Sequence, residues 1–403
     1  MTKTVVIVGS LDTKGPEFKF IKELIEQAGL KTLVVDFGVM GPPSFAPDIE
    51  RNEVVQAGGG DLAYLASGEH KDEAMKTMAT GLAVVVRRLY DEGRLDGIIG
   101  MGGSGGTSIA TAGMRTLPVG VPKVMVSTVG GGDVSAYAGT KDITFMPSIV
   151  DVAGINSISR TIYANAAGAI AGMVNMARPE VSEAKPLITA SMFGNTTKAV
   201  DRARLLLEQN GYEVLVFHAT GAGGKTMESL ISDGYIAGSL DITTTELADT
   251  VCGGVFDAGP ERCLAASRAG IPAVIAPGCV DMANFWGIDT VPEKYKGRKL
   301  YEWNPNVTLM RTNVAENIKI GGMIAAAANA ATAPVAILLP LKGVSMLDSP
   351  GGRFWDPEAD RACFEAIKHN VKANIPVIEL DYNINDPEFS GKATETLLEM
   401  LKK

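Results

Sequence analysis

Residues 95–108 read Leu95-Asp96-Gly97-Ile98-Ile99-Gly100-Met101-Gly102-Gly103-Ser104-Gly105-Gly106-Thr107-Ser108. A short β-branched run is followed by glycines and then by two hydroxyl residues of the kind that begin helices. This pattern predicts a buried strand, a glycine loop and a helix. Because glycine has no Cβ atom, the backbone of such a loop can approach a phosphate closely. The free N–H groups and the helix dipole would then attract the phosphate charge.

We therefore predict a phosphate-binding loop; the alternative is a tight turn that holds no ligand. The predicted contacts are Gly102, Gly103, Ser104, Gly105, Gly106 and Thr107. Gly100, Gly102 and Gly105 also fit the spacing G-x-G-x-x-G of dinucleotide-binding sites. However, the loop does not follow the first strand, and no acidic residue ends the next strand, Val124–Val126, to hold a ribose. The sequence favours a phosphate site over a hydride-cofactor site.

Short apolar runs alternate with amphipathic stretches along the rest of the chain, which is typical of parallel sheets with helices on both faces. The predicted strands of the first half are Val5–Val8, Thr32–Val35, Gly97–Ile99 and Val124–Val126, and the predicted helices are Pro16–Ala28, Asp72–Asp91 and Ser108–Met114. A segment with two prolines and four charges, residues 177–186, precedes a new strand, Leu187–Ala190. We predict an α/β protein of two tandem Rossmann-like domains, residues 1–182 and 183–403.

The two halves resemble one another. A shift of 182 positions places Val5–Val8 on Leu187–Ala190 and Leu33–Val35 on Leu215–Phe217. Any two domains of this class share a helix–glycine–strand rhythm, so a chance likeness is the alternative to a repeat. In either case, ligands are expected beyond the carboxyl ends of the strands.

Two further loops follow strands of the same predicted sheet. The first contributes Gly9, Ser10, Asp12, Thr13 and Lys14, and the second contributes Ser127, Thr128, Gly131, Gly132 and Asp133. Lys14 would meet a phosphate as a point charge, and Asp12 or Asp133 would hold Mg²⁺. Simple helix capping by Asp12 or Thr13 is the alternative.

In the second half, polar residues again follow apolar runs. The candidate catalytic residues are His218, Glu228, Asp241, Glu246 and Lys342, and Asp281 is expected near them. They would supply acid–base groups or a metal site in one cleft, or they simply open helices. A Walker A loop is excluded because Ala219 stands where its first glycine is required. The histidine spacing of zinc enzymes is missing too, and no metal is identified.

The composition of the chain argues against several classes of protein. The 403 residues carry a net charge of −9 with no dense basic run, which argues against a nucleic-acid partner. No apolar stretch reads as a membrane span or signal peptide. The four cysteines include no C-x-x-C pair, as expected for reduced thiols in a cytoplasmic protein.

Several longer motifs together resemble the Tm-one-type ATP-binding family. They are Gly9–Glu17, Met101–Thr107, Pro147–Asn156, His218–Gly221, Asp241–Glu246, Ser267–Pro272, Leu309–Thr312 and Leu341–Ser345, and they span nearly the whole chain. The resemblance implies two Rossmann-like domains, a homodimer, and ATP bound at Gly9–Lys14, Gly102–Thr107 and Ser127–Asp133. Relatives read Ser-Thr-Val-Ala-Ser-Gly where this chain has Ser-Thr-Val-Gly-Gly-Gly, so side-chain contacts there are in doubt.

A plant relative joins this region to a part resembling a TIM barrel, so a separately encoded TIM-barrel protein is an expected partner. The leading expectation is a cytosolic ATP-binding enzyme that acts on a small acidic or phosphorylated metabolite in the cleft between the domains. One alternative is a nucleotide-dependent sensor or interaction module without catalysis. The other is a hydrolase or lyase whose chemistry is confined to the second domain.

Overall fold

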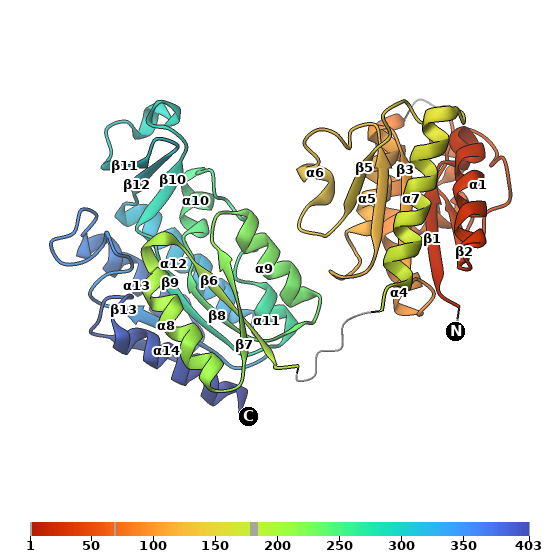
Figure 1. Ribbon diagram of the computed structural model, residues 1–403. Coiled ribbons are helices and arrows are strands. Elements are labelled where there is room, and N and C mark those ends of the chain that lie inside the picture. The colour runs from red at the N-terminus through yellow and green to blue at the C-terminus, as the bar shows by residue number, and fades with distance from the viewer. Residues whose placement is uncertain (1, 68–69, 178–183, 403) are drawn as a thin grey trace. The chain divides into compact units, whose positions relative to one another are not determined.

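The computed structural model describes residues 2–67, 70–177 and 184–402. The chain divides into two compact units, Met1–Glu180 (unit 1) and Val181–Lys403 (unit 2). The predicted boundary between residues 182 and 183 lies outside the described residues. Each unit contains a parallel sheet flanked by helices, so the predicted fold class of two Rossmann-like domains is confirmed (Figure 1).

Unit 1 is built on a five-stranded parallel sheet with the order β2-β1-β3-β4-β5. Its strands are β1 (Thr4–Gly9), β2 (Lys31–Asp36), β3 (Gly97–Gly102), β4 (Lys123–Ser127) and β5 (Thr144–Pro147). Its helices are α1 (Leu11–Gln27), α2 (Arg51–Ala57), α3 (Leu62–Leu65), α4 (Lys71–Asp91), α5 (Ser104–Met114), α6 (Ser135–Ala138) and α7 (Ser157–Asn175).

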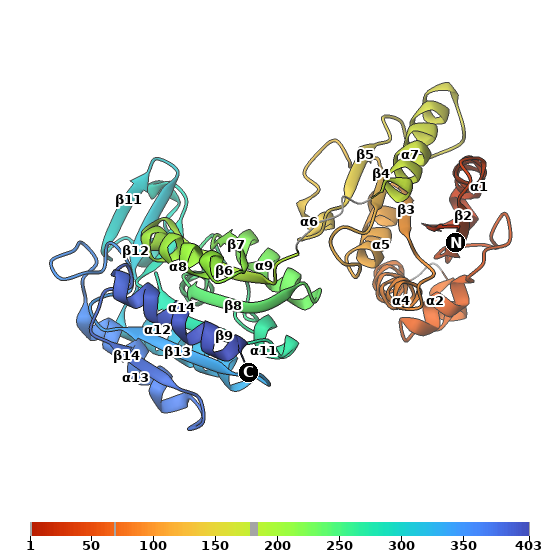
Figure 2. The same cartoon turned by 60° about the horizontal axis from the view of Figure 1, so that its bottom comes forward.

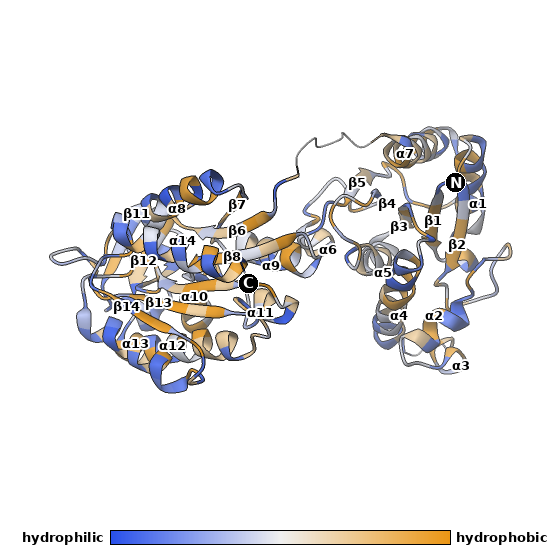
Figure 3. Ribbon diagram, turned by 90° about the horizontal axis from the view of Figure 1, so that it is seen from below, coloured by the Kyte–Doolittle hydropathy of each residue, from blue (hydrophilic) through white to orange (hydrophobic). Residues whose placement is uncertain are grey.

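The two faces of this sheet are covered by different helices. Val5 and Ile7 of β1 pack with α1 and α7, whereas Val6 and Val8 pack with α2, α4 and α5. This two-residue alternation follows from strand geometry. Figure 3 shows the apolar strands of unit 1 lying between α1 and α7 on one side and α4 and α5 on the other.

Unit 2 contains a six-stranded parallel sheet with the order β14-β13-β9-β8-β6-β7. Its strands are β6 (Leu187–Met192), β7 (Glu213–His218), β8 (Ile236–Thr243), β9 (Ala273–Gly278), β13 (Val335–Pro340) and β14 (Val377–Leu380). One face packs against α8 (Thr197–Gln209) and α14 (Pro387–Leu401), which lie on the same side in Figure 2. The other face packs against α9 (Ala222–Ser232), α10 (Glu246–Cys252), α11 (Ala265–Ala269), α12 (Val314–Asn329) and α13 (Pro357–Asn370).

A small antiparallel sheet extends unit 2. It has the order β10-β12-β11 and consists of β10 (Met282–Phe285), β11 (Leu300–Asn304) and β12 (Val307–Arg311). The sequence pattern does not predict this sheet, because strands of four or five residues carry little periodic signal.

The similar segments of the two halves occupy equivalent strands. β1 and β6 are the first strands of their sheets and β2 and β7 the second, and in both units the order around them is second, first, third, fourth. The two units therefore share the topology of their first four parallel strands.

Several predicted boundaries were wrong. β3 continues to Gly102, and α5 begins at Ser104 rather than Ser108. Helix α1 begins at Leu11 rather than Pro16 and passes through non-helical backbone at Lys14 (φ −129°, ψ 20°). No helix among the described residues has the length and apolarity needed to cross a membrane.

Candidate functional site

The loops after β1 and β3 diverge at the carboxyl edge of the unit 1 sheet. The two strands are neighbours, but α1 covers one face of the sheet and α5 covers the other. In open α/β sheets such a switch point forms a crevice in which ligands bind. The first candidate site therefore lies between these loops.

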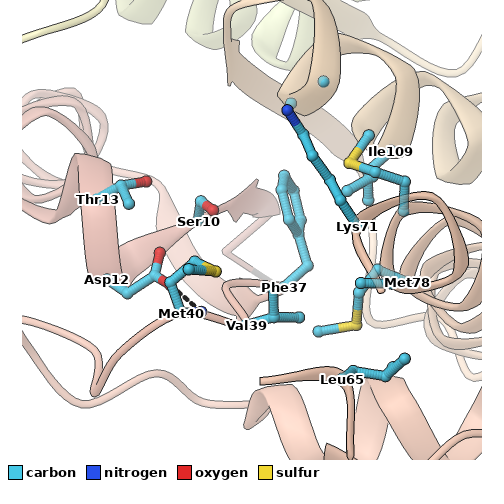
Figure 4. A pocket seen from close by; sticks show the side chains of 14 residues that line it. Ser10, Asp12, Thr13, Phe37, Val39, Met40, Leu65, Lys71, Met78 and Ile109 are labelled. Carbon is cyan, nitrogen blue, oxygen red and sulfur yellow. Dashed lines mark hydrogen bonds between the residues drawn. The ribbon is translucent and has the colours of Figure 1, made fainter. Parts of the chain in front are cut away.

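A cavity of about 410 Å³ occupies this crevice (the unit 1 cavity). Its lining residues are Ser10, Asp12, Thr13, Phe37, Val39, Met40, Leu65, Lys71, Ala74, Met75, Met78, Gly105, Gly106 and Ile109. Figure 4 shows Ser10, Asp12 and Thr13 on one side, Met78 and Ile109 on the other, and Lys71 extending past the Phe37 ring. A mainly apolar wall with a few polar groups is typical of a small-molecule site.

The amino terminus of α5 opens onto this cavity. Gly103 precedes the helix in extended conformation (φ −77°, ψ −167°), and no side chain caps this end. The first backbone bond of the helix runs from Thr107 N–H to Gly103 O (2.8 Å). The N–H groups of Ser104, Gly105 and Gly106 thus have no intrahelical acceptor, and together with the helix dipole they favour an anion.

The glycines at this end are not required by the fold. A Cβ atom at Gly103 would meet only Thr128 Oγ1, at 3.7 Å, and one at Gly105 would lie 3.4 Å from Met75 Cε, an ordinary contact. None of the three glycines from 103 to 106 has a positive φ. Glycine here keeps the approach to the backbone N–H groups open, which is what a bound phosphate requires.

Other predicted phosphate contacts have structural roles that account for the residue type on their own. A Cβ atom at Gly9 would lie 2.1 Å from the Phe18 ring, and one at Gly102 would lie 3.2 Å from Gly106 Cα. Thr107 is fully buried, and its Oγ1 lies 2.7 Å from Ser127 Oγ. These four residues serve close packing between elements.

Two aspartates shape the rim of the crevice. Asp12 Oδ2 accepts the N–H groups of Met40 (2.8 Å) and Gly41 (3.2 Å), and its Oδ1 has no partner among the described residues. Asp36 ends β2, and its Oδ1 accepts the N–H groups of Leu11 (3.0 Å) and Gly38 (2.9 Å). Burial raises the pKa of Asp36. Asp36 therefore holds the β1 loop in place, and both Asp12 Oδ1 and Asp36 Oδ2 are buried without a hydrogen-bond partner among the described residues.

The third predicted loop lines a separate cavity of about 450 Å³ with Thr128, Gly131 and residues 147–151. Gly132 N–H closes a turn on Val129 O (3.1 Å). Asp133 Oδ1 accepts the Ser135 N–H (2.9 Å), and hydrogen bonding to Ser135 lowers the pKa of this carboxyl. Lys14 lines neither this cavity nor the unit 1 cavity.

In unit 2, three of the predicted catalytic residues converge on an arginine that the sequence analysis missed. Arg262 is fully buried; it donates to both oxygens of Asp241, to Glu246 Oε2 (2.5 Å) and to Glu228 Oε1 (3.1 Å). Burial raises the pKa of Asp241, but Arg262 outweighs it and the pKa lies below its ordinary value. Burial raises the pKa of Glu228.

The carboxylates of this cluster are fully engaged. Glu246 Oε1 accepts the N–H groups of Gly221 (2.7 Å) and Gly224 (3.1 Å), and Glu228 accepts those of Cys263 and Ala265 (both 2.7 Å). With no free oxygen on Asp241 or Glu246 and almost no exposure, the cluster acts as an internal clamp in this structure. Glu246 also opens α10, as the alternative interpretation predicted.

Among the described residues, the remaining candidates form no ion pair with Arg262. His218 ends β7 and stacks on Phe193 (ring centroids 5.4 Å apart), and burial lowers its pKa. Lys342 follows β13 and pairs with Asp381 (2.9 Å). Asp281 accepts Ser345 Oγ–H (2.9 Å) inside a second buried cluster. Lys342 and Asp281 thus have their partners outside the Arg262 cluster, whereas Glu246 lies near enough to His218 to oppose the lowering of its pKa. A cleft shared by His218, Asp241 and Glu246 stays a prediction.

Two family descriptions together match nearly the whole chain. "Uncharacterised protein family (UPF0261) N-terminal domain" matches residues 3–179, and the corresponding C-terminal domain matches residues 185–401. The chain belongs to the UPF0261 family.

Relatives agree with this assignment. The chain is 52% identical over 404 residues to a UPF0261 protein of Clostridium tetani, with 100% of both chains covered. It is 42% identical over 339 residues to the tomato (Solanum lycopersicum) ToMV resistance protein Tm-1(GCR237), a match that covers 82% of this chain and 45% of the plant protein. The expected relationship to Tm-1 proteins is confirmed.

Likeness to solved structures is weak. The UDP-N-acetylglucosamine 2-epimerase of Rickettsia bellii matches with a TM-score of 0.25 and 9% identity, over 100% of this chain and 96% of that one.

The UPF0261 chain thus presents an anion-attracting helix end beside an apolar cavity in unit 1. Phe37, Met75 and Lys71 of this cavity were not predicted. The position of Phe37 directly after β2 was a usable signal, because ligands gather at strand ends. Among the described residues, no group of three or more His, Cys, Asp or Glu side chains is placed to hold a metal ion.

Proposed function

We propose that unit 1 binds ATP in the unit 1 cavity. The observation that carries this proposal is the open glycine cradle at the start of α5, which leads directly into an apolar cavity of about 410 Å³. The phosphates would lie on the N–H groups of residues 104–106, and Lys71 would neutralise part of their charge. The adenine ring would lie against Phe37 and Met75.

Mg²⁺ fits this arrangement if it binds with the nucleotide. Mg²⁺ commonly takes one or two carboxylates together with phosphate oxygens. Asp12 lines the cavity and keeps one oxygen without a partner, so it is the residue that would hold the ion. Asp133 is less suited, because its carboxylate is bonded to Ser135 on its own loop.

Isothermal titration with ATP and Mg²⁺ tests this site. Gly103→Val and Gly105→Val would fill the cradle and should lower the affinity by at least about a hundredfold, because they block several hydrogen bonds to a charged group. Gly168→Val is the matched control, since Gly168 lies in α7 with no atom within 4 Å of its Cβ position. ATP binding that both cradle variants retain would refute the proposal.

We further propose that ATP binding serves an enzyme acting on a small acidic or phosphorylated metabolite. A nucleotide-dependent interaction module is the second candidate. It is favoured by the small number of acid–base groups in the unit 1 cavity. Asp12 is the one carboxylate in the lining, and one of its two oxygens already accepts the N–H groups of Met40 and Gly41. The name of the tomato relative, a resistance protein, also suits an interaction role. ADP release in the presence of a metabolite panel supports the enzyme, and binding without turnover supports the module.

A hydrolase or lyase centred on Asp241 and Glu246 is the weakest candidate. Both residues are at most 4% exposed, and all their carboxylate oxygens are bonded. A substrate would have to displace Arg262 to reach either carboxylate.

A further inference from the structure

A further cavity lies at the carboxyl edge of the unit 2 sheet. It has a volume of about 580 Å³ and is lined by the loops that follow β6, β13 and β14 (the unit 2 cavity). Carboxyl edges of parallel sheets are where ligands bind in this class of fold. The cavity is separate from the Arg262 cluster, none of whose members line it.

The three loops are tied to one another. Asn383 Nδ2 donates to the carbonyls of Lys342, Ser345 and Asp348 (3.1 Å each). Asn385 Nδ2 donates to Asn195 O (2.9 Å), which also accepts the Met346 N–H (3.1 Å). These asparagine amides thus donate their hydrogen bonds to carbonyls of neighbouring loops. The bonds hold the three loops in place, so the walls of the cavity are formed without a ligand.

The conformation of the β13 loop depends on one glycine. Gly343 has φ +113°, and a Cβ atom there would lie 1.8 Å from Asp348 O. Only glycine adopts this geometry at low cost. Gly343 therefore sets the backbone path of the loop that carries Lys342, while the buried Val344 side chain anchors the loop to the core.

Positive charge reaches the cavity from two elements. Lys198 lies in the first turn of α8 and forms no ion pair among the described residues. Lys342 belongs to the β13 loop and, within the described part of the chain, forms an ion pair with Asp381 alone; this contact is exposed, and a ligand could replace it at small cost. Asp386 also lies near enough to Lys342 to attract its charge. The one carboxylate in the lining, Asp386, accepts the Asn383 N–H (2.8 Å) on its own loop.

We propose that the unit 2 cavity binds a small anionic metabolite, one that carries a phosphate or carboxylate group. Lys198 and Lys342 would contact the anionic oxygens, and the α8 dipole would add to the attraction. All of these groups belong to unit 2. The proposal therefore stands independently of ATP binding in unit 1.

The tryptophans provide a reporter for this cavity. All three tryptophans, Trp286, Trp303 and Trp355, belong to unit 2. A Cβ atom at Gly194, which lines the cavity, would lie 3.8 Å from the Trp303 ring. A ligand in the cavity should therefore alter tryptophan fluorescence.

The experiment titrates the chain with inorganic phosphate, succinate and 3-phosphoglycerate as probes. Tryptophan fluorescence is followed directly, and equilibrium dialysis is carried out on Gly105→Val, in which the unit 1 cradle is filled. We expect saturable binding of at least one probe with millimolar or better affinity. The phosphate and carboxylate arms show which anionic group is preferred.

Lys198→Gln and Lys342→Gln should each weaken this binding about tenfold, because each removes a charge-assisted contact. Lys368→Gln is the matched control, an exposed, ion-paired lysine of α13 outside the cavity, and should bind like the parent. Unfolding in urea confirms that the variants fold. The proposal is overturned if no probe binds saturably up to about 10 mM, or if both lysine variants bind like the parent.

Discussion

Arg262 and Asp241 form a two-point ion pair in the interior of unit 2. Arg262 Nη1 and Nη2 donate to Asp241 Oδ2 and Oδ1 at 2.5 and 2.7 Å, and neither side chain is more than 5% exposed. The same guanidinium reaches Glu246 and Glu228, so one arginine joins β8, α10 and α9. The cluster contains three carboxylates and one cation, so Arg262 supplies the one positive charge that balances them.

Replacing Arg262 with methionine should therefore destabilise unit 2 severely. The change leaves three buried carboxylates without their cation, and breaking a buried pair in this way costs about 3–5 kcal/mol. Urea unfolding followed by tryptophan fluorescence reports on unit 2. Arg268→Met, which removes an exposed pair with Glu261, should change the free energy of unfolding by less than about 0.5 kcal/mol. If the two changes lowered the free energy of unfolding equally, the Arg262 cluster would contribute no more stability than an exposed ion pair.

Lys71→Gln should weaken ATP binding without affecting the fold. Lys71 lines the unit 1 cavity, and loss of a hydrogen bond between charged groups lowers affinity by about tenfold to a hundredfold. Titration calorimetry measures the change. Lys76→Gln, an exposed lysine of the same helix outside the lining, is the matched control. An unchanged dissociation constant in Lys71→Gln would remove this residue from the proposed site.

Unit 2 should lose stability as the pH rises from about 4 to 9. Burial and Asp348 raise the pKa of Asp360 from 3.8 to about 9 and that of Asp281 to about 7, whereas Arg311 opposes both shifts. In this range the folded state holds protons that the unfolded state has released, so rising pH favours unfolding. One such proton gives a slope of up to about 1.4 kcal/mol per pH unit.

Asp360→Asn should flatten this dependence. An asparagine can still accept the Arg311 bond now made by Asp360 Oδ1 (2.6 Å), but it does not titrate. Urea unfolding near pH 5, 7 and 9 measures the slope, and Asp289→Asn, at an exposed position, is the control. A slope in Asp360→Asn as steep as in the parent would contradict the assignment.

Two glycine substitutions in unit 2 should act in opposite directions. Gly343→Ala places a Cβ atom against Asp348 O at positive φ, and it should destabilise the fold by about 1–3 kcal/mol or more. Gly322→Ala, in the interior of α12 with no atom within 4 Å of its Cβ position, should stabilise it by about 0.5–1 kcal/mol. Thermal and urea unfolding measure both changes. Stabilisation by Gly343→Ala would disprove the proposed loop geometry.

The strands were largely predictable because buried parallel strands are continuous apolar runs. Val5–Val8 and Leu187–Ala190 fall within β1 and β6. Glycines were harder to interpret, because glycine occurs both in loops and at positions where a neighbouring element packs closely against the backbone. Gly100 was placed in a loop but lies within β3, where a Cβ atom would be 2.9 Å from Ala110 Cβ. Only the packing of α5 on β3 reveals that role.

The site was predictable in part for the same reason. Ser10, Asp12, Thr13, Gly105 and Gly106 follow strand ends, and all of them line the unit 1 cavity. Arg262 lies in an irregular segment between α10 and α11 with no motif around it. Its partners are 16 to 34 positions away in the sequence, and only tertiary packing brings them together. The periodic pattern of the sequence carries no signal for such contacts.

The distribution of cysteines makes this chain easy to label at a chosen place. Cys252, Cys263, Cys279 and Cys363 all lie in unit 2, and each is at most 4% exposed. Buried thiols of this kind resist alkylating dyes. A single cysteine introduced on the surface of unit 1 would therefore take up a fluorophore selectively, and the native tryptophans of unit 2 would act as energy-transfer donors. Energy transfer from these tryptophans to the fluorophore would then report any change in the distance between the two units when nucleotide is added.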